Sequence, residues 1–303
     1  MKIKHLLSFI KDPVARFNIL SSRGLLGWMD DETYIKKYYR IRTGKKLNLK
    51  NPQTYNEKLQ WLKLHDRKDI YTTMVDKYEA KEYVAKIIGE KYIIPTYGVW
   101  DNFDDISFNT LPEQFVLKCT HDSGGLIIVK DKSKLDMQAA RKKIMKCPKR
   151  NYYSHGREWP YKNVKPRIIA EKYMEEKGIN TEEGLRDYKI FCFDGEPKLI
   201  QVDYNRFDNH KRNLYTTDWN YVEASIKYPT DPNHQIAKPT PLNEMLDVAR
   251  KLSQGMPHLR VDLYCVDDKV YFGELTLCHG TGMEVFSPES LGIEMGKWLK
   301  LPQ

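Results

Sequence analysis

The spacing of apolar residues along the chain changes near residue 92. Before that point apolar side chains recur every three or four residues, which is the period of amphipathic helices. One helix is predicted to start from a cap at Asp30 or Asp31, and another to span Thr73 to Ile88. Between them, Thr54 and Glu57 have the spacing of a capping box, so a third helix is expected to begin there. The first seventy residues are therefore predicted to be mostly helical.

Beyond residue 92, short apolar runs bounded by polar turns predict strands instead of helices. The candidate strands are YIIPTYGVW, FVLKCT, GLIIVKD, RIIAEKYM, DYKIFCFDG, PKLIQVDYN, RVDLYCVDD and KVYFGELTL. Turns at Asp194-Gly195-Glu196 and at Asp267-Asp268-Lys269 join two pairs of them into antiparallel hairpins. Helices are expected at about 134–147 and 242–254, whereas the polar segment 205–241 is predicted to form long loops. The pattern indicates an α+β fold with antiparallel sheets rather than a doubly wound parallel sheet.

Composition narrows the class of protein without identifying a partner. The chain has 303 residues, of which 41% are apolar, so it can bury a core and form either one large domain or two lobes. Fifty Lys and Arg against 41 Asp and Glu leave a net charge of +9, which favours an anionic partner. No apolar run approaches the roughly 18 residues of a membrane-spanning helix. The start, MKIKHLLSFIKDP, does not have the pattern of a signal peptide; it is either a helix packed on its own domain or a short basic helix at a membrane surface.

The five cysteines have no spacing that suggests a zinc site or a disulfide framework. Their number is odd, and three of them lie inside predicted strands. Free thiols in a reducing compartment are therefore expected, which indicates a cytoplasmic protein.

A glycine-containing loop separates two predicted strands in FVLKCTHDSGGLIIVKD. Lys118 ends the first strand, and Ser123, Gly124 and Gly125 lie in the loop. Small residues let backbone N–H groups approach an anion, and the lysine adds a positive charge. A plain hairpin is the commoner structure for such a segment, so the loop alone is weak evidence.

Two carboxylates are predicted to face each other in the last hairpin. If Asp267 to Lys269 form a three-residue loop, Asp262 lies opposite Glu274, on the face that also carries Arg260. Thr276 is the next residue on the Glu274 side of that face. Adjacent carboxylates favour a cation between them, and Mg²⁺ suits an all-oxygen site. A two-residue turn would instead place them on opposite faces, and pairing with Arg260 or solvent is the alternative to a metal.

Other charged residues lie at strand ends or in polar segments. Glu171, Lys172 and Tyr173 end the strand RIIAEKYM, either as a hinge between lobes or as an ordinary strand end. Lys189 shares a strand face with two phenylalanines and is either a phosphate contact or a lysine at a sheet rim. Candidate contacts for an anionic acceptor, or else members of a solvated basic loop, are Arg186, Arg206, His210, Lys211 and Arg212. By position alone, His121 and His279 are candidate proton acceptors.

The order of these segments resembles the ATP-grasp superfamily and, more narrowly, the TupA-like ATP-grasp proteins of teichuronopeptide biosynthesis. The narrower resemblance rests on GKKLNLKNPQTYNEKLQWLKL, VDKYEAKEYV, FVLKCTHDSGG and VYFGELTLCHGTGMEVFSPE, and it spans roughly residues 30–300. Among these segments NPQTYNEKLQWLK is specific to the narrower family. The resemblance implies a helical extension over 1–70, a short segment over 71–105, a small lobe over 106–175 and a large lobe over 176–303.

The resemblance also implies a nucleotide site between two α+β lobes. Lys77 and Lys118 would contact the α- and β-phosphates of ATP, and Lys189 would also reach phosphate. The loop of Ser123, Gly124 and Gly125 would close over the γ-phosphate. The backbone of Glu171, Lys172 and Tyr173 would contact adenine. Glu175 or Glu176 would bind the ribose.

On the acceptor side, Asp262 and Glu274 would bind one or two Mg²⁺ ions, and Arg260 with the loop from Gly280 to Gly282 would stabilise the reacting groups. The superfamily usually has Asn two residues after the metal-binding Glu, whereas this chain has Thr276. A hydroxyl is a poorer ligand for Mg²⁺ than an amide carbonyl, so a second ion would bind more weakly or through water.

The family occurs with enzymes of bacterial surface polysaccharides, and its members are taken to be ATP-dependent carboxylate–amine ligases. The resemblance therefore implies amide formation on a uronic acid through an acyl phosphate, in the cytoplasm or at the inner membrane face. The implied partners are ATP, a uronic-acid-containing sugar or glycan, and a small amine or amino acid. No nucleic acid is expected as a partner. Membrane contact is expected to be at most peripheral, through Lys2, Lys4 and the Lys45–Lys50 region. The alternatives are a sugar or small-molecule kinase and a non-catalytic polysaccharide- or nucleic-acid-binding protein that uses YNRFDNHKRNLY. A glycosyltransferase ranks lower because no Asp-x-Asp pair follows a nucleotide-sugar fold.

Overall fold

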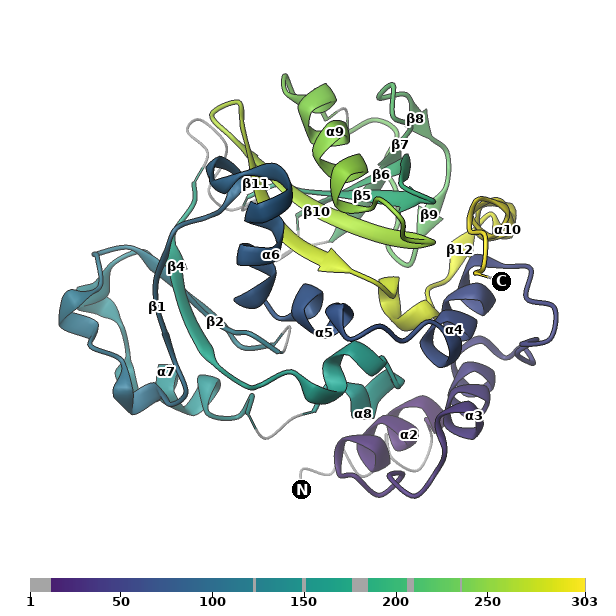
Figure 1. The fold of residues 1–303 in the computed structure, drawn as a ribbon, viewed down its shortest axis with the longest axis horizontal. Coiled ribbons are helices and arrows are strands. Elements are labelled where there is room, and N and C mark those ends of the chain that lie inside the picture. Colours follow the sequence, from purple (N-terminus) through teal and green to yellow (C-terminus); the bar gives the residue numbers. More distant parts are fainter. Residues whose placement is uncertain are drawn as a thin grey trace.

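The protein has the predicted α+β architecture, with two antiparallel sheets and helices around them (Figure 1). The computed structural model describes residues 12–121, 124–148, 151–175, 185–205, 210–234 and 236–302. In these ranges the smaller sheet has four strands and the larger has six. Helices α5 and α6 lie between the two sheets. Within the same ranges, no helix has the length and apolar character needed to cross a bilayer.

The N-terminal part of the chain is helical, as predicted. Its helices are α2 (Pro13–Ser22), α3 (Asp31–Thr43), α4 (Tyr55–His65), α5 (Ile70–Val75) and α6 (Glu79–Ile88). Asp30 caps α3, and the capping box of Thr54 and Glu57 starts α4. The single helix predicted over Thr73 to Ile88 is wrong, because Asp76 leaves the helical conformation and its Oδ1 accepts the backbone N–H groups of Tyr78 and Glu79.

The smaller sheet has the strand order β1-β4-β2-β3. Its strands are β1 (Thr96–Trp100), β2 (Phe115–Cys119), β3 (Leu126–Val129) and β4 (Ile168–Lys172). One face packs against α7 (Met137–Ile144), and the other face carries Lys118 and Glu171. Strand β1 lies in the segment predicted to precede the small lobe, yet it pairs along β4 and so belongs to this sheet.

The larger sheet has the order β11-β10-β5-β6-β7-β8. Its strands are β5 (Asp187–Phe193), β6 (Glu196–Tyr204), β7 (Lys211–Tyr215), β8 (Tyr221–Val222), β10 (His258–Val266) and β11 (Lys269–Thr276). A separate short pair is formed by β9 (Ser225–Ile226) and β12 (Phe286–Ser287). The prediction of long loops over 205–241 is wrong in part, because this segment contains β7, β8 and β9 and β7 pairs along β6. The side chains of β7 do not alternate between apolar and polar, so the sequence pattern did not indicate a strand.

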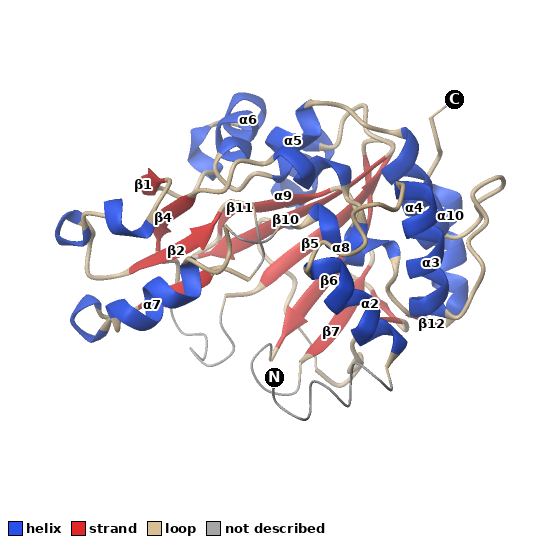
Figure 2. Ribbon diagram, turned by 90° about the horizontal axis from the view of Figure 1, so that it is seen from below, coloured by secondary structure: helices blue, strands red, loops and turns tan. Residues whose placement is uncertain are grey.

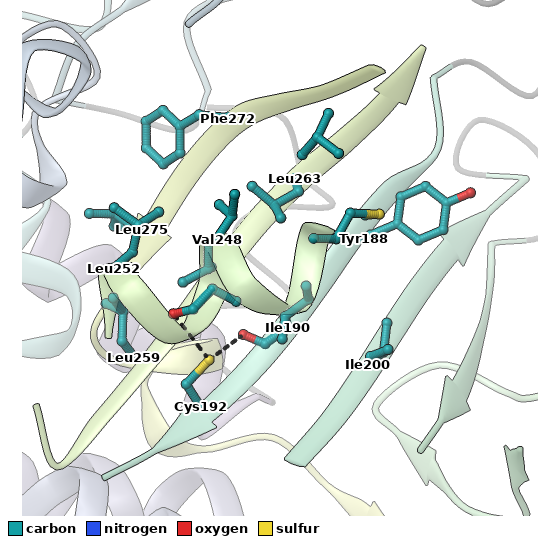
Figure 3. Packing of buried hydrophobic residues seen from close by; sticks show 14 of the residues in the cluster. Tyr188, Ile190, Cys192, Ile200, Val248, Leu252, Leu259, Leu263, Phe272 and Leu275 are labelled. Carbon is teal, nitrogen blue, oxygen red and sulfur yellow. Dashed lines mark hydrogen bonds between the residues drawn. The ribbon is translucent and has the colours of Figure 1, made fainter. Parts of the chain in front are cut away.

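Helix α9 (Leu242–Leu252) covers one face of the larger sheet and forms the main core with it. Figure 3 shows this packing around Cys192, whose Sγ lies 3.8 Å from the Ala249 carbonyl of α9. All five cysteines are free thiols, as predicted, and the structure shows that all five are buried. The opposite face packs against α4 and α10 (Glu289–Trp298), which lie with α3 at the end of the molecule away from the smaller sheet (Figure 2). The remaining short helices are η1 (Glu90–Tyr92), η2 (Phe103–Asp105), η3 (Phe108–Thr110), η4 (Lys132–Lys134), η5 (Trp159–Asn163), η6 (His279–Gly282) and α8 (Tyr153–Gly156).

The last hairpin places Asp262 opposite Glu274, although its turn differs from the predicted one. The turn has two residues, so Val266 lies opposite Lys269 and Tyr264 opposite Tyr271. Continued without interruption, this register would put the two carboxylates on opposite faces. A bulge at Gly273 adds one residue to β11 and returns Glu274 to the face of Asp262.

Gly273→Ala is expected to lower the free energy of unfolding by about 1–3 kcal/mol, because the bulge has no room for a side chain. An added Cβ would lie 2.9 Å from Cε2 of Tyr264 and 3.0 Å from the backbone oxygen of Asp262. Urea unfolding monitored by tryptophan fluorescence measures the change. A loss below about 0.5 kcal/mol would contradict the claim that a glycine is required here.

Candidate functional site

One face of the larger sheet is apolar toward one end of its strands and charged toward the other end. We call these two regions the apolar half and the charged half. Phe191, Phe193 and Leu199 pack against α4 and α10 in the apolar half. The charged half carries Asp187, Lys189, Asp203, Arg212, Arg260, Asp262 and Glu274. Since neighbouring strands hold these residues in register, charges of both signs lie next to one another on a buried surface.

Arg260 and Asp262 form a bidentate ion pair at the centre of this charged half. Nε and Nη2 of Arg260 each donate to a different carboxylate oxygen of Asp262, at 2.7 Å. Lys189 on the adjacent strand donates to the same carboxylate at 2.9 Å and also contacts Asp187. Burial opposes the charge on Arg260, but Asp262 outweighs it and raises the pKa of the guanidinium. The structure therefore brings together Arg260, Asp262 and Lys189, three of the predicted site residues.

His279 is held by the same arginine. Nη1 of Arg260 lies 2.6 Å from Nδ1 of His279, and a guanidinium can only donate, so Nδ1 accepts. Burial and the nearby Arg260 lower the pKa of His279 well below its usual value, and the neutral ring carries its proton on Nε2. The expectation that His279 accepts a proton is therefore wrong. Its Nε2 is a buried donor with no hydrogen-bond partner among the described residues.

His121 has the opposite arrangement of donor and acceptor. Its Nε2 lies 3.0 Å from the carbonyl of Cys147, which can only accept, so the proton is on Nε2. Nδ1 is buried and has no partner within the described ranges. His121 thus keeps an acceptor nitrogen beside the glycine loop, and its role in proton transfer stays a prediction.

Glu274 connects the charged half of the larger sheet to the smaller sheet through Lys77. Nζ of Lys77 lies 3.8 Å from one oxygen of Glu274, and Thr276 donates to the other oxygen at 3.1 Å. Burial would raise the pKa of Glu274, but Lys77 and Arg260 hold it below its usual value. The backbone N–H of Lys77 donates to the carbonyl of Thr120, which follows β2, at 3.1 Å. Lys77 therefore touches the strand before the glycine loop and a carboxylate of the predicted metal site.

The predicted metal site has the oxygen ligands that Mg²⁺ prefers, but the carboxylate of Asp262 is already paired with Arg260 and Lys189. Asp262 and Glu274 lie opposite each other with Thr276 beside them, which is the all-oxygen set that Mg²⁺ prefers. Both oxygens of Asp262 accept bonds from cations, so a metal ion would compete with Arg260 and Lys189 for them. Among the described residues, no three His, Cys, Asp or Glu side chains are grouped so that they could hold a metal.

On the smaller sheet, Lys118 lies beside Glu171. Nζ of Lys118 is 2.5 Å from Oε2 of Glu171, and Nζ of Lys81 is 2.5 Å from Oε1. Lys81 is a site residue that the sequence reasoning missed. Its position three residues before Val84, on the buried face of α6, is the signal that would have found it, since a lysine on an apolar stripe needs an internal partner.

The other predicted nucleotide residues are only partly brought together. Lys172 and Glu175 are exposed at and after the end of β4, and Tyr173 lies near Lys130. Gly125 accepts a backbone bond from Cys119 at 2.8 Å and has no room for a side chain beside Cys119 and Cys147. Gly124 is exposed. Ser123, Glu176 and Arg206 lie outside the described residues.

Three of the basic residues predicted to bind the acceptor have internal partners. Arg212 donates to Asp203 at 2.6 Å and to the carbonyl of Ile226 at 3.0 Å. His210 lies 3.2 Å from the same Asp203 carboxylate, and Lys211 pairs with Asp231 at 2.5 Å. Arg186 is half-buried just before β5. Arg212 therefore belongs to the charged half of the sheet rather than to a solvated loop.

Helix α4 holds the glycine turn after β11 in place, a role that the sequence reasoning did not assign. The turn has three successive left-handed residues, Gly280, Thr281 and Gly282, with φ of 54°, 59° and 67°. Gln60 donates to the carbonyls of Thr281 and Gly282 at 2.9 and 2.7 Å. Lys63 is buried and donates to the carbonyls of Gly156 and Thr281 at 2.9 and 2.8 Å. The specific segment NPQTYNEKLQWLK thus carries the side chains that position this turn.

Lys63→Met is expected to lower the free energy of unfolding by about 1–3 kcal/mol, because it leaves buried carbonyls without a donor. The matched control is Lys58→Met on the same helix, where a half-buried lysine bonds a single carbonyl, that of Leu299. Denaturant titration of both variants measures the difference. Equal losses would contradict a specific role for Lys63 at the turn.

Two comparisons with known proteins found similar proteins, and a third found no match. The model of the TupA-like ATPgrasp family matches residues 57–300. D-alanine–D-alanine ligase from Helicobacter pylori is similar at 13% identity and a TM-score of 0.44, over 82% of this chain and 70% of that chain. N5-carboxyaminoimidazole synthetase from Staphylococcus aureus is similar at 13% identity and a TM-score of 0.40, over 84% and 61%. No curated protein matches the chain.

The family match covers well over half of the chain. It includes Gln60 and Lys63 of α4, the Lys77 junction, the glycine loop and the hairpin of Asp262 and Glu274. The resemblance predicted from the sequence is therefore confirmed. The chain belongs to the TupA-like ATP-grasp family and is an ATP-dependent enzyme of the ligase type.

Proposed function

We propose that the protein is an ATP-dependent carboxylate–amine ligase that forms an amide on a uronic acid for a bacterial surface polysaccharide. The observation that carries this proposal is the position of Lys77. Its backbone bonds Thr120 beside the glycine loop, and its side chain reaches Glu274 on the larger sheet. A phosphate chain between the two sheets would thus meet the loop, the lysine and the carboxylates together.

In this proposal ATP lies between the smaller lobe, 106–175 together with β1, and the larger lobe, 176–303. Lys77, Lys118 and Lys189 neutralise its phosphates, and Ser123, Gly124 and Gly125 cover the γ-phosphate. The backbone of residues 171–173 meets adenine, and Glu175 or Glu176 meets ribose. Glu274, Asp262 and Thr276 hold Mg²⁺, which supplies charge neutralisation at the phosphates when bound.

The proposed reaction has two steps. An oxygen of the substrate carboxylate attacks the γ-phosphorus, the bond to the β-phosphate breaks, and ADP leaves. The amine nitrogen then attacks the carbonyl carbon of the acyl phosphate, and phosphate leaves as the amide forms and the amine loses a proton. Such a reaction needs positioning and neutralised charge rather than a protein nucleophile.

The chain's own residues supply these needs on the acceptor side. Arg260 is a fixed, buried cation, and it orients His279 so that Nε2–H is a donor with no partner among the described residues. Both groups suit the negative charge that develops on the acyl oxygens. The turn of Gly280 and Gly282 holds His279 there, and Arg186, Arg206, His210 and Arg212 are the proposed contacts of the sugar.

The proposal is tested with purified protein, ATP, Mg²⁺ and a panel of uronic acids paired with amines. We expect ADP, phosphate and an amide in equal amounts, measured by coupled assay and mass spectrometry. A stable phosphorylated sugar would instead identify a kinase that uses the same site. ATP binding without ADP release from any pair would contradict the ligase proposal, and absence of ATP binding would favour a polysaccharide-binding protein.

Glu274→Gln is expected to lower kcat by about 10²-fold or more, because it removes a charge from the proposed metal site. Asp262 is less suitable, since its loss would leave Arg260 and Lys189 as buried, unpaired cations. Glu82→Gln is the control, because it removes an exposed carboxylate from α6. The kcat of both variants decides the question, with thermal unfolding as the check of folding. Unchanged kcat in Glu274→Gln would refute its role.

The proposal also includes peripheral contact with an anionic membrane. It is supported by a basic hollow that lies over α3 and the segment after it. The charged residues that line the hollow are Glu32, Lys36, Lys37, Arg40, Lys46 and Lys50. Glu32 pairs with Lys36, whereas the other four cations have no ion pair within the described part of the chain. A surface with a surplus of unpaired cations is attracted to anionic lipid.

The double change Lys37→Glu and Arg40→Glu is expected to abolish flotation with phosphatidylglycerol vesicles at low salt, because it reverses the charge of the hollow. The matched control is Lys142→Glu with Lys143→Glu, which makes the same charge change on the exposed side of α7. Phosphatidylcholine vesicles should not bind the wild type. Binding to polyuronate but to neither vesicle would replace the membrane with a polysaccharide as the partner.

A further inference from the structure

Glu171 is buried between two lysines that come from different elements. Its side chain is 5% exposed, and its two oxygens lie 2.5 Å from Lys81 on α6 and 2.5 Å from Lys118 on β2. Strand pairing sets Val116 opposite Glu171, so Lys118 lies on the same face of the sheet, diagonally across. Burial would raise the pKa of Glu171, but Lys118 and Lys81 hold it below its usual value. The group therefore contains one anion and two cations.

The two lysines are held very differently. Besides Glu171, Lys81 donates to the carbonyl of Ile94 at 2.7 Å and to the hydroxyl of Thr96 at 2.9 Å. These three bonds use all three protons of its ammonium group. Lys118 is 23% exposed, against 11% for Lys81, and within the described residues Glu171 is its one ion-pair partner. Lys118 is thus the member of the group that can move.

From these contacts we infer that Lys81 is a positioning residue, the permanent counter-ion of Glu171, and that it leaves the charge of Lys118 available to a nucleotide phosphate. The inference rests on the proposed function, in which Lys118 contacts ATP. Without Lys81, movement of Lys118 toward phosphate would leave a buried carboxylate without a partner, which is strongly unfavourable. With Lys81 in place, Glu171 stays paired and the group keeps a net charge of +1 for the ligand.

The first test is the pair of variants Lys81→Met and Lys81→Met with Glu171→Gln, with the dissociation constant for ATP measured by calorimetry. Lys81→Met lowers the charge of the group to zero and should weaken ATP binding about tenfold or more. Adding Glu171→Gln returns the charge to +1 and frees Lys118, so affinity should recover to within about threefold of the wild type. If Lys81 only joins α6 to β1, the ATP affinity of the double variant should not recover. That result would overturn the inference.

Two single variants keep the test decisive if Lys81→Met does not fold. Glu171→Gln alone leaves two cations without an opposing charge, so it should bind ATP as tightly as the wild type or more tightly. Affinity more than about tenfold weaker in this variant would overturn the inference. Thr96→Val is the matched control, because it removes one bond of Lys81 without changing the charge of the group.

The outcomes separate this inference from the proposed function. If the wild type does not bind ATP, the proposed function fails. If the wild type binds ATP and Lys81→Met binds it equally well, only the role of Lys81 fails.

Discussion

The buried ion pair between Arg260 and Asp262 is the interaction on which the site depends. Asp262 also holds Lys189 on the neighbouring strand, and Arg260 holds His279 in the glycine turn. One pair therefore sets the positions of side chains from three segments of the chain. Because loss of either partner would leave a charge uncompensated in the interior, the pair and its neighbours form one unit rather than a set of separate contacts.

The second constraint is the junction between α5 and α6, where the two sheets meet. Asp76 ends α5, and its Oδ1 accepts the backbone N–H groups of Tyr78 and Glu79 at the start of α6. Arg167, just before β4, donates to Asp76 at 2.8 Å and to Glu79 at 2.7 Å. The junction fixes Lys77 between Thr120 and Glu274. The helix break that the apolar spacing did not predict is thus the feature that joins the glycine loop to the carboxylates.

Much of the fold follows from local patterns. Apolar runs and tight polar turns predicted β5, β6, β10 and β11, and the capping box predicted the start of α4. Strand β7 was missed because Lys211, Arg212 and Asn213 look like a polar loop, and only Asp203 on the adjacent strand gives Arg212 an internal partner. The opposition of Asp262 and Glu274 was predicted correctly from an incorrect turn, since the bulge at Gly273 offsets the shorter turn.

The sequence by itself determined most of the elements, because helix and strand periods, caps and turn residues are local signals, and its specific segments determined the family. The tertiary structure alone decided which charges meet. Lys81 reaches Glu171, and Gln60 and Lys63 reach the glycine turn near the other end of the chain. Such pairs leave no periodic trace, since a buried charge is stabilised by whichever partner the fold brings within bonding distance.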